Sequence, residues 1–208
     1  MAPGRLYIIS APSGAGKTSL VKALIEHNDN IMPSVSHTTR PRRNGEVDGV
    51  DYHFVSDSEF RQMLADNAFL EYAEVFDHFY GTSRYEVDSK RSKGIDVILE
   101  IDWQGARQIH ALIPEAISIF ILPPSLETLL ERLNARGQDQ QSVIERRMTA
   151  ARKEMVHYDE YQYLIINDVF SDALDQLHCI VTSNRLKLKQ QQHDHAALLQ
   201  ALIGEEVK

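Results

Sequence analysis

Short apolar runs alternate with amphipathic stretches along most of the chain. Four runs have the length and composition of buried strands, at 6–10, 97–101, 117–122 and 163–166. Apolar residues recur with helical spacing at 17–27, 104–112, 125–134, 142–157 and 171–178. Strands that alternate with helices require crossover connections, which favour a parallel sheet with helices on its faces. The pattern therefore predicts an α/β core built on a parallel β-sheet flanked by helices.

Two stretches depart from this rhythm. Residues 34–88 carry prolines, glycines and aromatics with short alternating runs, which predicts a small mixed lobe inserted after the first helix. A stretch rich in charge and glutamine predicts a mobile flap between two helices, at about 132–152. The division that follows is a core at 1–33 and 89–185 with a helical lid at about 126–155, an inserted lobe at 34–88, and a C-terminal helical tail at 186–208.

Length, charge and cysteine content indicate the size of the domain, the kinds of partner and the compartment. The 208 residues suffice for one compact domain with a full hydrophobic core, and the net charge of −8 argues against a nucleic-acid backbone as partner. The single Cys179 lies in an apolar neighbourhood and is expected to be a buried thiol. The absence of paired cysteines suits a reducing cytosol. With neither a signal-peptide pattern nor an apolar run of about 18 residues, we expect a cytoplasmic protein without a membrane partner.

The strongest chemical signal is a glycine-rich loop between the first strand and the first helix. It reads APSGAGKT and comprises Ala11, Pro12, Ser13, Gly14, Ala15, Gly16, Lys17 and Thr18. Glycines let successive backbone N–H groups face one anion, and the following helix presents its positive end to the same phosphates. Lys17 supplies a mobile cation for the β- and γ-phosphates, and the Thr18 hydroxyl is a candidate Mg²⁺ ligand. The loop predicts nucleoside triphosphate binding.

Ala11 stands where this loop usually begins with glycine. Alanine is the smallest departure from glycine, and it requires a φ angle that a residue with a Cβ tolerates. We therefore expect the loop to bind phosphates despite this change.

An arginine cluster indicates a second anionic substrate. Arg40, Arg42 and Arg43 lie within four residues, and the kink at Pro41 can aim them at one point. Guanidinium groups match phosphate oxygens in geometry and charge. In an acidic chain with a phosphate loop, the cluster favours a phosphate-bearing acceptor over a merely solvated loop.

At this point the sequence resembles the guanylate kinase family. The matching segments cover most of residues 6–185 and read SAPSGAGKT, SVSHTTRPRRNGEVDGVDYHFV, FLEYAEVFDHFYGTS, ILEIDWQG, FILPPSLETLLERLNARG and IIND. Together they are specific, whereas the phosphate loop alone is shared by many families. The resemblance implies transfer of the γ-phosphoryl group of ATP to GMP, and of the same group to dGMP, with Mg²⁺ as cofactor. It also implies a GMP-binding lobe at 34–88 and an arginine-bearing lid.

The resemblance implies the residues of the GMP site. The phosphate of GMP is expected on Arg40, Arg43, Tyr52 and Tyr80, and guanine on Ser36, Glu71, Thr82 and Asp102. Thr82 stands where the family often has serine, so a hydroxyl is retained. No role is assigned to His37 or Trp103, although Trp103 suits a wall of the core.

The chemistry of guanine supports a carboxylate reader independently. Guanine presents two adjacent donors, N1–H and the exocyclic amine, which one carboxylate such as Glu71 can accept side by side. Adenine presents an acceptor at N1, whose lone pair would face that carboxylate. Hydroxyls from Ser36 and Thr82 can donate to the guanine O6. A buried site of this kind rejects the wrong base because mismatched polar groups stay unpaired.

Two acids lie at the end of the strand predicted at 97–101. Glu100 and Asp102 have the same strand parity, so their side chains can share a face. Proteins with a phosphate loop often place an acid there to hold Mg²⁺ or its water shell. The residues leave open which acid serves the metal, and the resemblance places Asp102 on the guanine side.

Further arginines fall in the predicted lid, at Arg132, Arg136, Arg146, Arg147 and Arg152. The resemblance implies that Arg132, Arg136 and Arg147 face ATP and act in catalysis together with Lys17 and Arg40. Arginines that arrive with a closing lid can position the reactants and neutralise the transferring group. By the same resemblance, Asn167 lies where the family contacts adenine.

Three rival interpretations remain at this level. A ribose bisphosphate kinase would keep the loop and lid without a guanine reader, and a phosphopeptide-binding scaffold would not need the intact Gly16, Lys17 and Thr18. A regulatory GTPase would need an N-K-x-D motif, which the sequence lacks. The sequence leaves the oligomeric state open, because the C-terminal helix could pack on its own core or on a second copy in a homo-oligomer.

Overall fold

The chain folds around one parallel sheet that carries the phosphate loop at its centre. The structure is a computed structural model that describes residues 2–75, 77–135 and 141–204. The sheet has the order β2-β7-β1-β8-β9, and all its neighbouring strands run parallel. Its strands are β1 (Leu6–Ser10), β2 (Ile31–Pro33), β7 (Asp96–Glu100), β8 (Ile117–Leu122) and β9 (Tyr163–Ile166). The predicted α/β core is confirmed.

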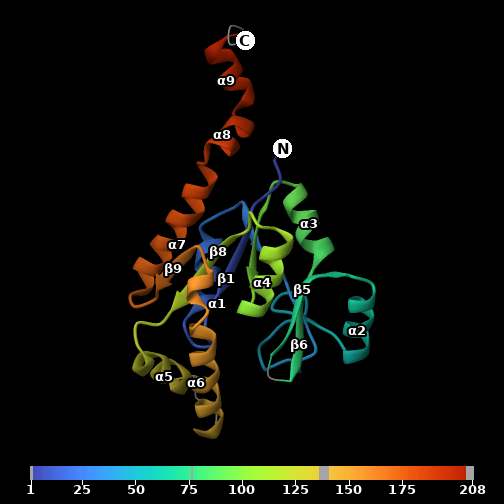
Figure 1. Cartoon of the computed structure of the whole chain (residues 1–208), viewed down its shortest axis with the longest axis vertical. Coiled ribbons are helices and arrows are strands. Elements are labelled where there is room, and N and C mark those ends of the chain that lie inside the picture. Colours follow the sequence, from blue (N-terminus) through green and yellow to red (C-terminus); the bar gives the residue numbers. More distant parts are fainter. Residues whose placement is uncertain (1, 76, 136–140, 205–208) are drawn as a thin grey trace.

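Helices cover both faces of this sheet, as the continuous apolar strands require. Tyr7 and Ile9 of β1 belong to an apolar cluster with helices on one face, whereas Leu6 and Ile8 belong to a cluster on the other. The first face carries α1 (Lys17–Glu26) and α7 (Phe170–Arg185); the second carries α3 (Arg84–Ser92) and α4 (Trp103–Leu112) (Figure 1). Burial on both faces fixes β1 and therefore the loop that follows it.

A second, four-stranded sheet lies beside the core, in the order β4-β3-β6-β5. It consists of β3 (His37–Thr38), β4 (His53–Phe54), β5 (Phe69–Val75) and β6 (His78–Ser83). The helix α2 (Asp57–Ala65) packs on it through Phe60, whose ring stacks on Phe69 at 4.6 Å and on Phe79 at 5.5 Å. These elements fall within the predicted inserted lobe, whose domain boundaries stay a prediction.

Two helices occupy the predicted lid region. They are α5 (Leu126–Ala135) and α6 (Gln141–Met155), which lie at the far end of the molecule from the tail (Figure 1). Leu129 and Leu133 of α5 pack against Ile144 and Ala151 of α6. Most of the stretch predicted as a mobile flap is therefore helical, because this apolar stripe gives the two helices a small core of their own.

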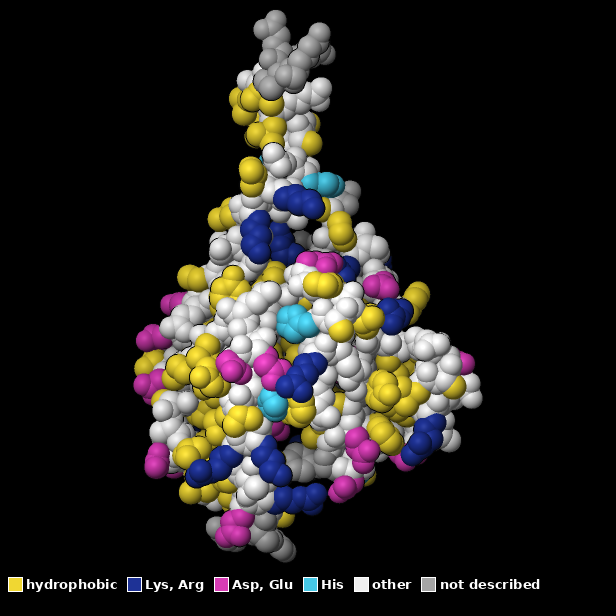
Figure 2. Space-filling model, in the orientation of Figure 1, with side chains coloured by type: hydrophobic (Ala, Val, Ile, Leu, Met, Phe, Trp, Pro, Cys, Tyr) yellow, Lys and Arg dark blue, Asp and Glu magenta, His cyan; other side chains and the backbone are white. Residues whose placement is uncertain are grey.

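The C-terminal tail projects from the body in Figure 1. A C-terminal helix was predicted in the tail at 186–208, whereas the structure has two helices there, α8 (Leu188–Asp194) and α9 (Ala196–Ile203). Hydrophobic side chains lie on the tail surface in Figure 2, where Leu198 is 55% and Leu202 is 70% exposed. The preceding helix α7 continues beyond the predicted end at 178, because Val181 and Asn184 extend its buried stripe.

Other predictions need correction or completion. Cys179 is exposed rather than buried, because it lies on the opposite side of α7 from the buried Leu177 and Val181. The sequence pattern did not reveal β2, which has only three residues, nor α2 and α3, which are largely polar, nor the 3₁₀ turn at Tyr158–Glu160. Among the described residues, none of the helices has the length and hydrophobicity needed to cross a bilayer.

Candidate functional site

A cavity of about 550 Å³ opens where the carboxyl ends of β1 and β7 meet the second sheet and the lid. Predicted site residues from all three parts line it: Ala11, Pro12, Ser13, Gly14, Gly16, Lys17, Thr18, Ser36, Arg40, Arg43, Tyr52, Glu71, Tyr80, Asp102 and Arg147. Glu100, Arg146 and Glu154 line it as well. The carboxyl edge of a parallel sheet is where ligands of such folds bind.

The phosphate loop has the backbone shape that its glycines predict. Gly14 and Gly16 have φ angles of 97° and 95°, in the left-handed region. Ala11 does not have a positive φ, so the departure from glycine costs no strain there. A Cβ at Gly16 would lie 2.3 Å from the Asn167 side-chain nitrogen, so this position also requires glycine for close approach. The loop then leads into α1 at Lys17.

Asn167 and Arg132 support the loop from behind instead of lining the cavity. The buried Asn167 donates through Nδ2 to the carbonyl oxygen of Ala15 at 2.7 Å, and Arg132 Nη2 donates to the carbonyl of Asn167 at 3.0 Å. Arg132 Nη1 is buried and finds no hydrogen-bond partner among the described residues. A buried donor of this kind is costly unless a ligand satisfies it.

Thr18 and Glu100 meet at the rim of the loop. The Thr18 hydroxyl donates to Glu100 Oε2 at 3.2 Å, because β1 and β7 are neighbours in the sheet. Asp102 points elsewhere: it is the N-cap of α4, and its Oδ1 accepts the Gly105 N–H at 2.9 Å. The two acids that the sequence could not distinguish are therefore separated, with Glu100 on the side of the phosphate loop.

Glu71 is the most buried acid of the cavity, with 4% of its surface exposed. Thr82, its partner across the β5–β6 pair, donates its hydroxyl to Glu71 Oε1 at 2.5 Å. Burial and, to a smaller extent, the nearby Asp102 raise the pKa of Glu71 to about 7, against the lowering effects of Thr82 and Lys17. Thr82 is itself fully buried, so in this arrangement its hydroxyl acts on Glu71 rather than on the cavity.

The arginine cluster is organised by an acid that the sequence reasoning did not single out. Arg40 is 8% exposed and makes a two-pronged contact with Glu46, at 2.7 and 3.0 Å. Glu46 also accepts the backbone N–H of Arg43 at 2.7 Å, and the bond from Arg40 holds its pKa below the usual value. The signal available in the sequence was an acid three residues after the last arginine of the cluster.

Two tyrosines border this arginine. The Arg40 guanidinium lies 5.3 Å from the centre of the Tyr52 ring, and the Tyr52 and Tyr80 rings meet edge to face at 5.9 Å. Burial raises the pKa of Tyr52, so its hydroxyl stays protonated and able to donate. Together with the exposed Arg43 they form a wall of hydrogen-bond donors on the side of the second sheet.

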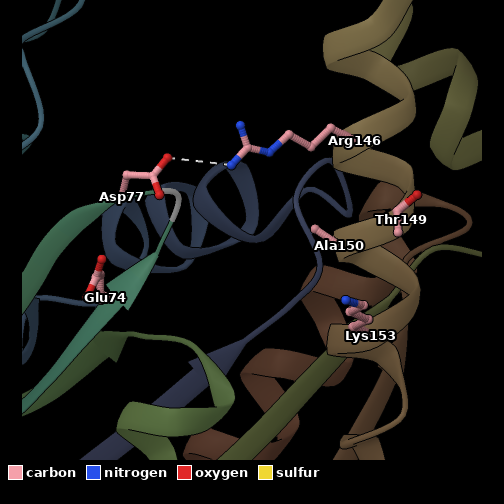
Figure 3. A pocket seen from close by; sticks show the side chains of 6 residues that line it. All are labelled: Glu74, Asp77, Arg146, Thr149, Ala150 and Lys153. Atoms are coloured by element: carbon pink, nitrogen blue, oxygen red, sulfur yellow. Dashed lines mark ion pairs between the residues drawn. The ribbon is translucent and has the colours of Figure 1, made fainter.

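The lid contacts both other parts of the site. Arg147 Nη2 donates to the Ser13 hydroxyl at 2.7 Å, which joins α6 to the phosphate loop. The preceding residue, Arg146, forms a 3.6 Å ion pair with Asp77, at the β5–β6 hairpin (Figure 3). Glu74, Thr149, Ala150 and Lys153 line the hollow between these elements, which has a volume of about 620 Å³ (Figure 3).

Glu154 is a second acid that the sequence reasoning missed. It lies on α6 two turns after Arg147 and lines the cavity. Burial and, to a smaller extent, Asp102 raise its pKa to about 7, although Lys17 and the Ser13 N–H act in the opposite direction. The lid thus brings a carboxylate as well as arginines to the phosphate loop. Its spacing of seven residues from Arg147 was the available signal.

The structure assembles most of the predicted site around one cavity. Ala15, Thr82, Arg132 and Asn167 lie in contact with lining residues or with the loop backbone, and none of the four lines the cavity. Arg136 lies outside the described residues. Trp103, which received no role, stacks on His157 at 3.9 Å and packs under Arg107, beside the base of α6.

Known proteins resemble this chain over nearly its whole length. The family model described as guanylate kinase matches residues 3–184. A guanylate kinase of Saccharophagus degradans is 60% identical over 97% of this chain and 98% of that protein, and one of Vibrio cholerae is 55% identical over 99% and 100%. The crystal structure of guanylate kinase from Anaplasma phagocytophilum is similar with a TM-score of 0.74 and 31% identity, over 93% of this chain and 96% of that one.

Proposed function

The chain belongs to the guanylate kinase family and phosphorylates GMP at the expense of ATP, and we propose which of its residues bind each nucleotide and which promote the transfer. The observation that carries the proposal is a single cavity lined by the phosphate loop, the arginine–tyrosine wall and the Glu71 carboxylate. Two anionic nucleotides placed in this cavity point their phosphates at one another. That arrangement suits direct transfer between them.

The phosphate loop holds ATP. Its backbone N–H groups and the N-terminus of α1 face the β- and γ-phosphates, and Lys17 neutralises their charge. Thr18 and Glu100 present a hydroxyl and a carboxylate oxygen 3.2 Å apart, a donor pair of the hard type that Mg²⁺ prefers. Mg²⁺ bound there would offset charge on the phosphates. Asn167 supports the loop, and Arg132 Nη1, which has no partner in the part of the chain that the structure describes, offers a donor to the nucleotide.

GMP occupies the side of the second sheet. Glu71 accepts the guanine N1–H and amino group, Ser36 donates to O6, and Asp102 completes the polar wall. Thr82 orients Glu71, because its hydroxyl already donates to that carboxylate.

The phosphate of GMP contacts the wall of donors. Arg40 and Arg43 supply charge, and Tyr52 and Tyr80 supply hydroxyl groups. Glu46 keeps Arg40 aimed at the cavity through its two-pronged contact. A phosphate bound by Arg40 would share that guanidinium with Glu46.

Transfer requires position and charge rather than a general base. An oxygen of the GMP phosphate is already a nucleophile, so the site needs to align it with the γ-phosphorus and to stabilise the charge that develops. Arg147 and Arg132, together with Arg136 from outside the described residues, provide that charge as the lid approaches. A closed lid also keeps water from the γ-phosphate.

The proposal extends to substrate range and location. We place dGMP among the acceptors, because none of the proposed contacts requires the ribose 2′-hydroxyl. The single cysteine and the acidic net charge of −8 fit a protein of the cytoplasm whose partners are nucleotides rather than nucleic acids.

A coupled ADP-release assay across the nucleoside monophosphates tests the proposal. GMP and dGMP should be phosphorylated, whereas AMP, CMP and UMP should show kcat/KM values lower by about 10²-fold or more. Omission of Mg²⁺ should abolish turnover. Comparable turnover with AMP would contradict the guanine reader, and turnover without any divalent cation would contradict the role of Thr18 and Glu100.

A further inference from the structure

The Glu71 carboxylate lies against the first turn of helix α4, at Gly105. A Cβ placed on Gly105 would lie 2.4 Å from Glu71 Oε2 and 3.1 Å from Glu71 Cδ. Ordinary contacts of a Cβ begin at 3.4 Å. The carboxylate therefore occupies the space that any side chain at position 105 would fill.

The backbone of Gly105 does not itself require glycine. Its φ is not among the positive values of the described glycines, and the residue lies inside α4 between Trp103 and Leu112. Glycine within a helix lowers helix stability relative to alanine. The helix alone would disfavour glycine at position 105, and the close approach of Glu71 explains why glycine is there.

Hydrogen bonds hold both partners of this contact and leave the carboxylate one direction in which to move. Glu71 Oε1 accepts the Thr82 hydroxyl at 2.5 Å, and the two residues are paired across the β5–β6 ladder. Gly105 donates its N–H to Asp102 Oδ1 at 2.9 Å, which pins the start of α4. The strand and the helix start are thus fixed on the two sides of the carboxylate, and the open side is the cavity, which Glu71 lines.

We infer that Gly105 is a positioning residue for guanine recognition, because its missing side chain sets the depth of the Glu71 carboxylate in the site. An alanine there forces Oε2 toward the cavity by about 1 Å, and a misplacement of that size is enough to impair a positioned group strongly. Thr82 fixes one carboxylate oxygen through its hydrogen bond, and Gly105 leaves space for the other. The inference rests on the proposed role of Glu71 in binding guanine.

The experiment measures steady-state kinetics of Gly105→Ala. The KM for GMP should rise about 10- to 100-fold, whereas the KM for ATP should stay unchanged. The melting temperature should not fall, since alanine favours the helix. Ala111→Gly, on the exposed side of α4, is the matched control. It should lower the melting temperature and leave both KM values unchanged. A rise in the KM for ATP equal to that for GMP would show general damage and overturn the inference.

A second variant tests the contact itself. Glu71→Asp shortens the side chain by one methylene, so it leaves room for the methyl group of alanine at position 105. Gly105→Ala should then change the KM for GMP less than about threefold in the Glu71→Asp background, a non-additivity that reports direct contact. An equally large rise in both backgrounds would refute the contact. If Gly105→Ala alone does not fold, the double variant still decides the matter: it should fold with a KM for GMP within about threefold of that of Glu71→Asp, and its failure to do so would refute the contact.

Glu71→Ala separates failure of the inference from failure of the proposed function. If Glu71→Ala raises the KM for GMP and Gly105→Ala does not, the positioning role is wrong and the guanine reader stands. If Glu71→Ala leaves the KM for GMP unchanged, the proposed role of Glu71 is itself wrong.

Discussion

The phosphate loop and the guanine pocket face the same cavity but are built in different ways. The loop is contiguous, from Ala11 to Thr18, and it binds mainly through backbone N–H groups shaped by two glycines with positive φ. The proposed guanine pocket draws Ser36, Glu71 and Asp102 from separate segments. One half is therefore a local structure and the other is a product of tertiary packing.

The phosphate loop and the guanine pocket therefore differ in the substitutions that they tolerate. The loop accepts alanine at position 11, because the φ angle there suits any residue. The pocket depends on burial: Glu71 is 4% exposed, its hydroxyl partner Thr82 is fully buried, and its flank at Gly105 leaves no space for a Cβ. Small changes around a buried polar group leave it unpaired or displaced, which costs more than the same change at a surface.

The largest effect should come from the loop cation. Lys17→Ala should lower kcat by about 10³-fold while GMP binding stays largely intact, because the lysine acts on the phosphates of ATP. ADP release and calorimetric titration with GMP measure the two quantities. Lys22→Ala, an exposed lysine on the same helix, is the control and should behave as the unchanged protein. Near-normal turnover of Lys17→Ala would contradict the assignment of the phosphate loop.

A substitution in the proposed guanine pocket should weaken GMP binding and leave ATP binding nearly unchanged. Glu71→Ala should raise the KM for GMP by about 10- to 100-fold and reduce discrimination against AMP, with little change in the KM for ATP, since two guanine donors lose their acceptor. Glu26→Ala removes an exposed carboxylate at the end of α1 and serves as the control. An unchanged GMP affinity by titration would remove Glu71 from the site.

The pH dependence of GMP binding sharpens the comparison. Burial raises the pKa of Glu71 to about 7, and guanine donors require the ionised carboxylate. The ionised fraction grows as pH rises through 7, so the KM for GMP should fall several-fold between about pH 6 and pH 8. Glu71→Gln removes this acid and leaves the titration of the GMP phosphate, so the difference between the two profiles isolates Glu71. Identical profiles would show that Glu71 does not titrate in this range.

The smallest effect is expected at the ion pair between lid and hairpin. Asp77 and Arg146 side chains are 85% and 66% exposed, and such pairs contribute about 0–1 kcal/mol. Asp77→Asn removes the charge and keeps a residue that tolerates the φ of 65° there. Both KM values should change less than about fivefold at low salt and still less at high salt. A change of 100-fold would give this pair a role in closure that its exposure does not predict.

Local patterns in the sequence were enough for the core and the phosphate loop. The strands at 6–10 and 117–122 are continuous apolar runs, and the loop signature lies between a strand and a helix, so each is visible without knowledge of distant residues. The strand β2 was missed because three residues are too few to show a period, and α3 was missed because it carries few apolar residues of its own. Cys179 was misplaced because an apolar neighbourhood in sequence does not say which side of a helix faces the core.

By itself, the sequence determined the parallel α/β core, the phosphate loop with Lys17 and Thr18, and the arginine cluster. Only the tertiary structure decided that Glu100 meets Thr18, that Thr82 is committed to Glu71, and that Glu46 and Glu154 belong to the site. The reason is physical. Backbone conformation follows from neighbouring residues, whereas the pKa and the hydrogen-bond partners of a buried acid depend on groups that are distant in the chain and meet only on folding.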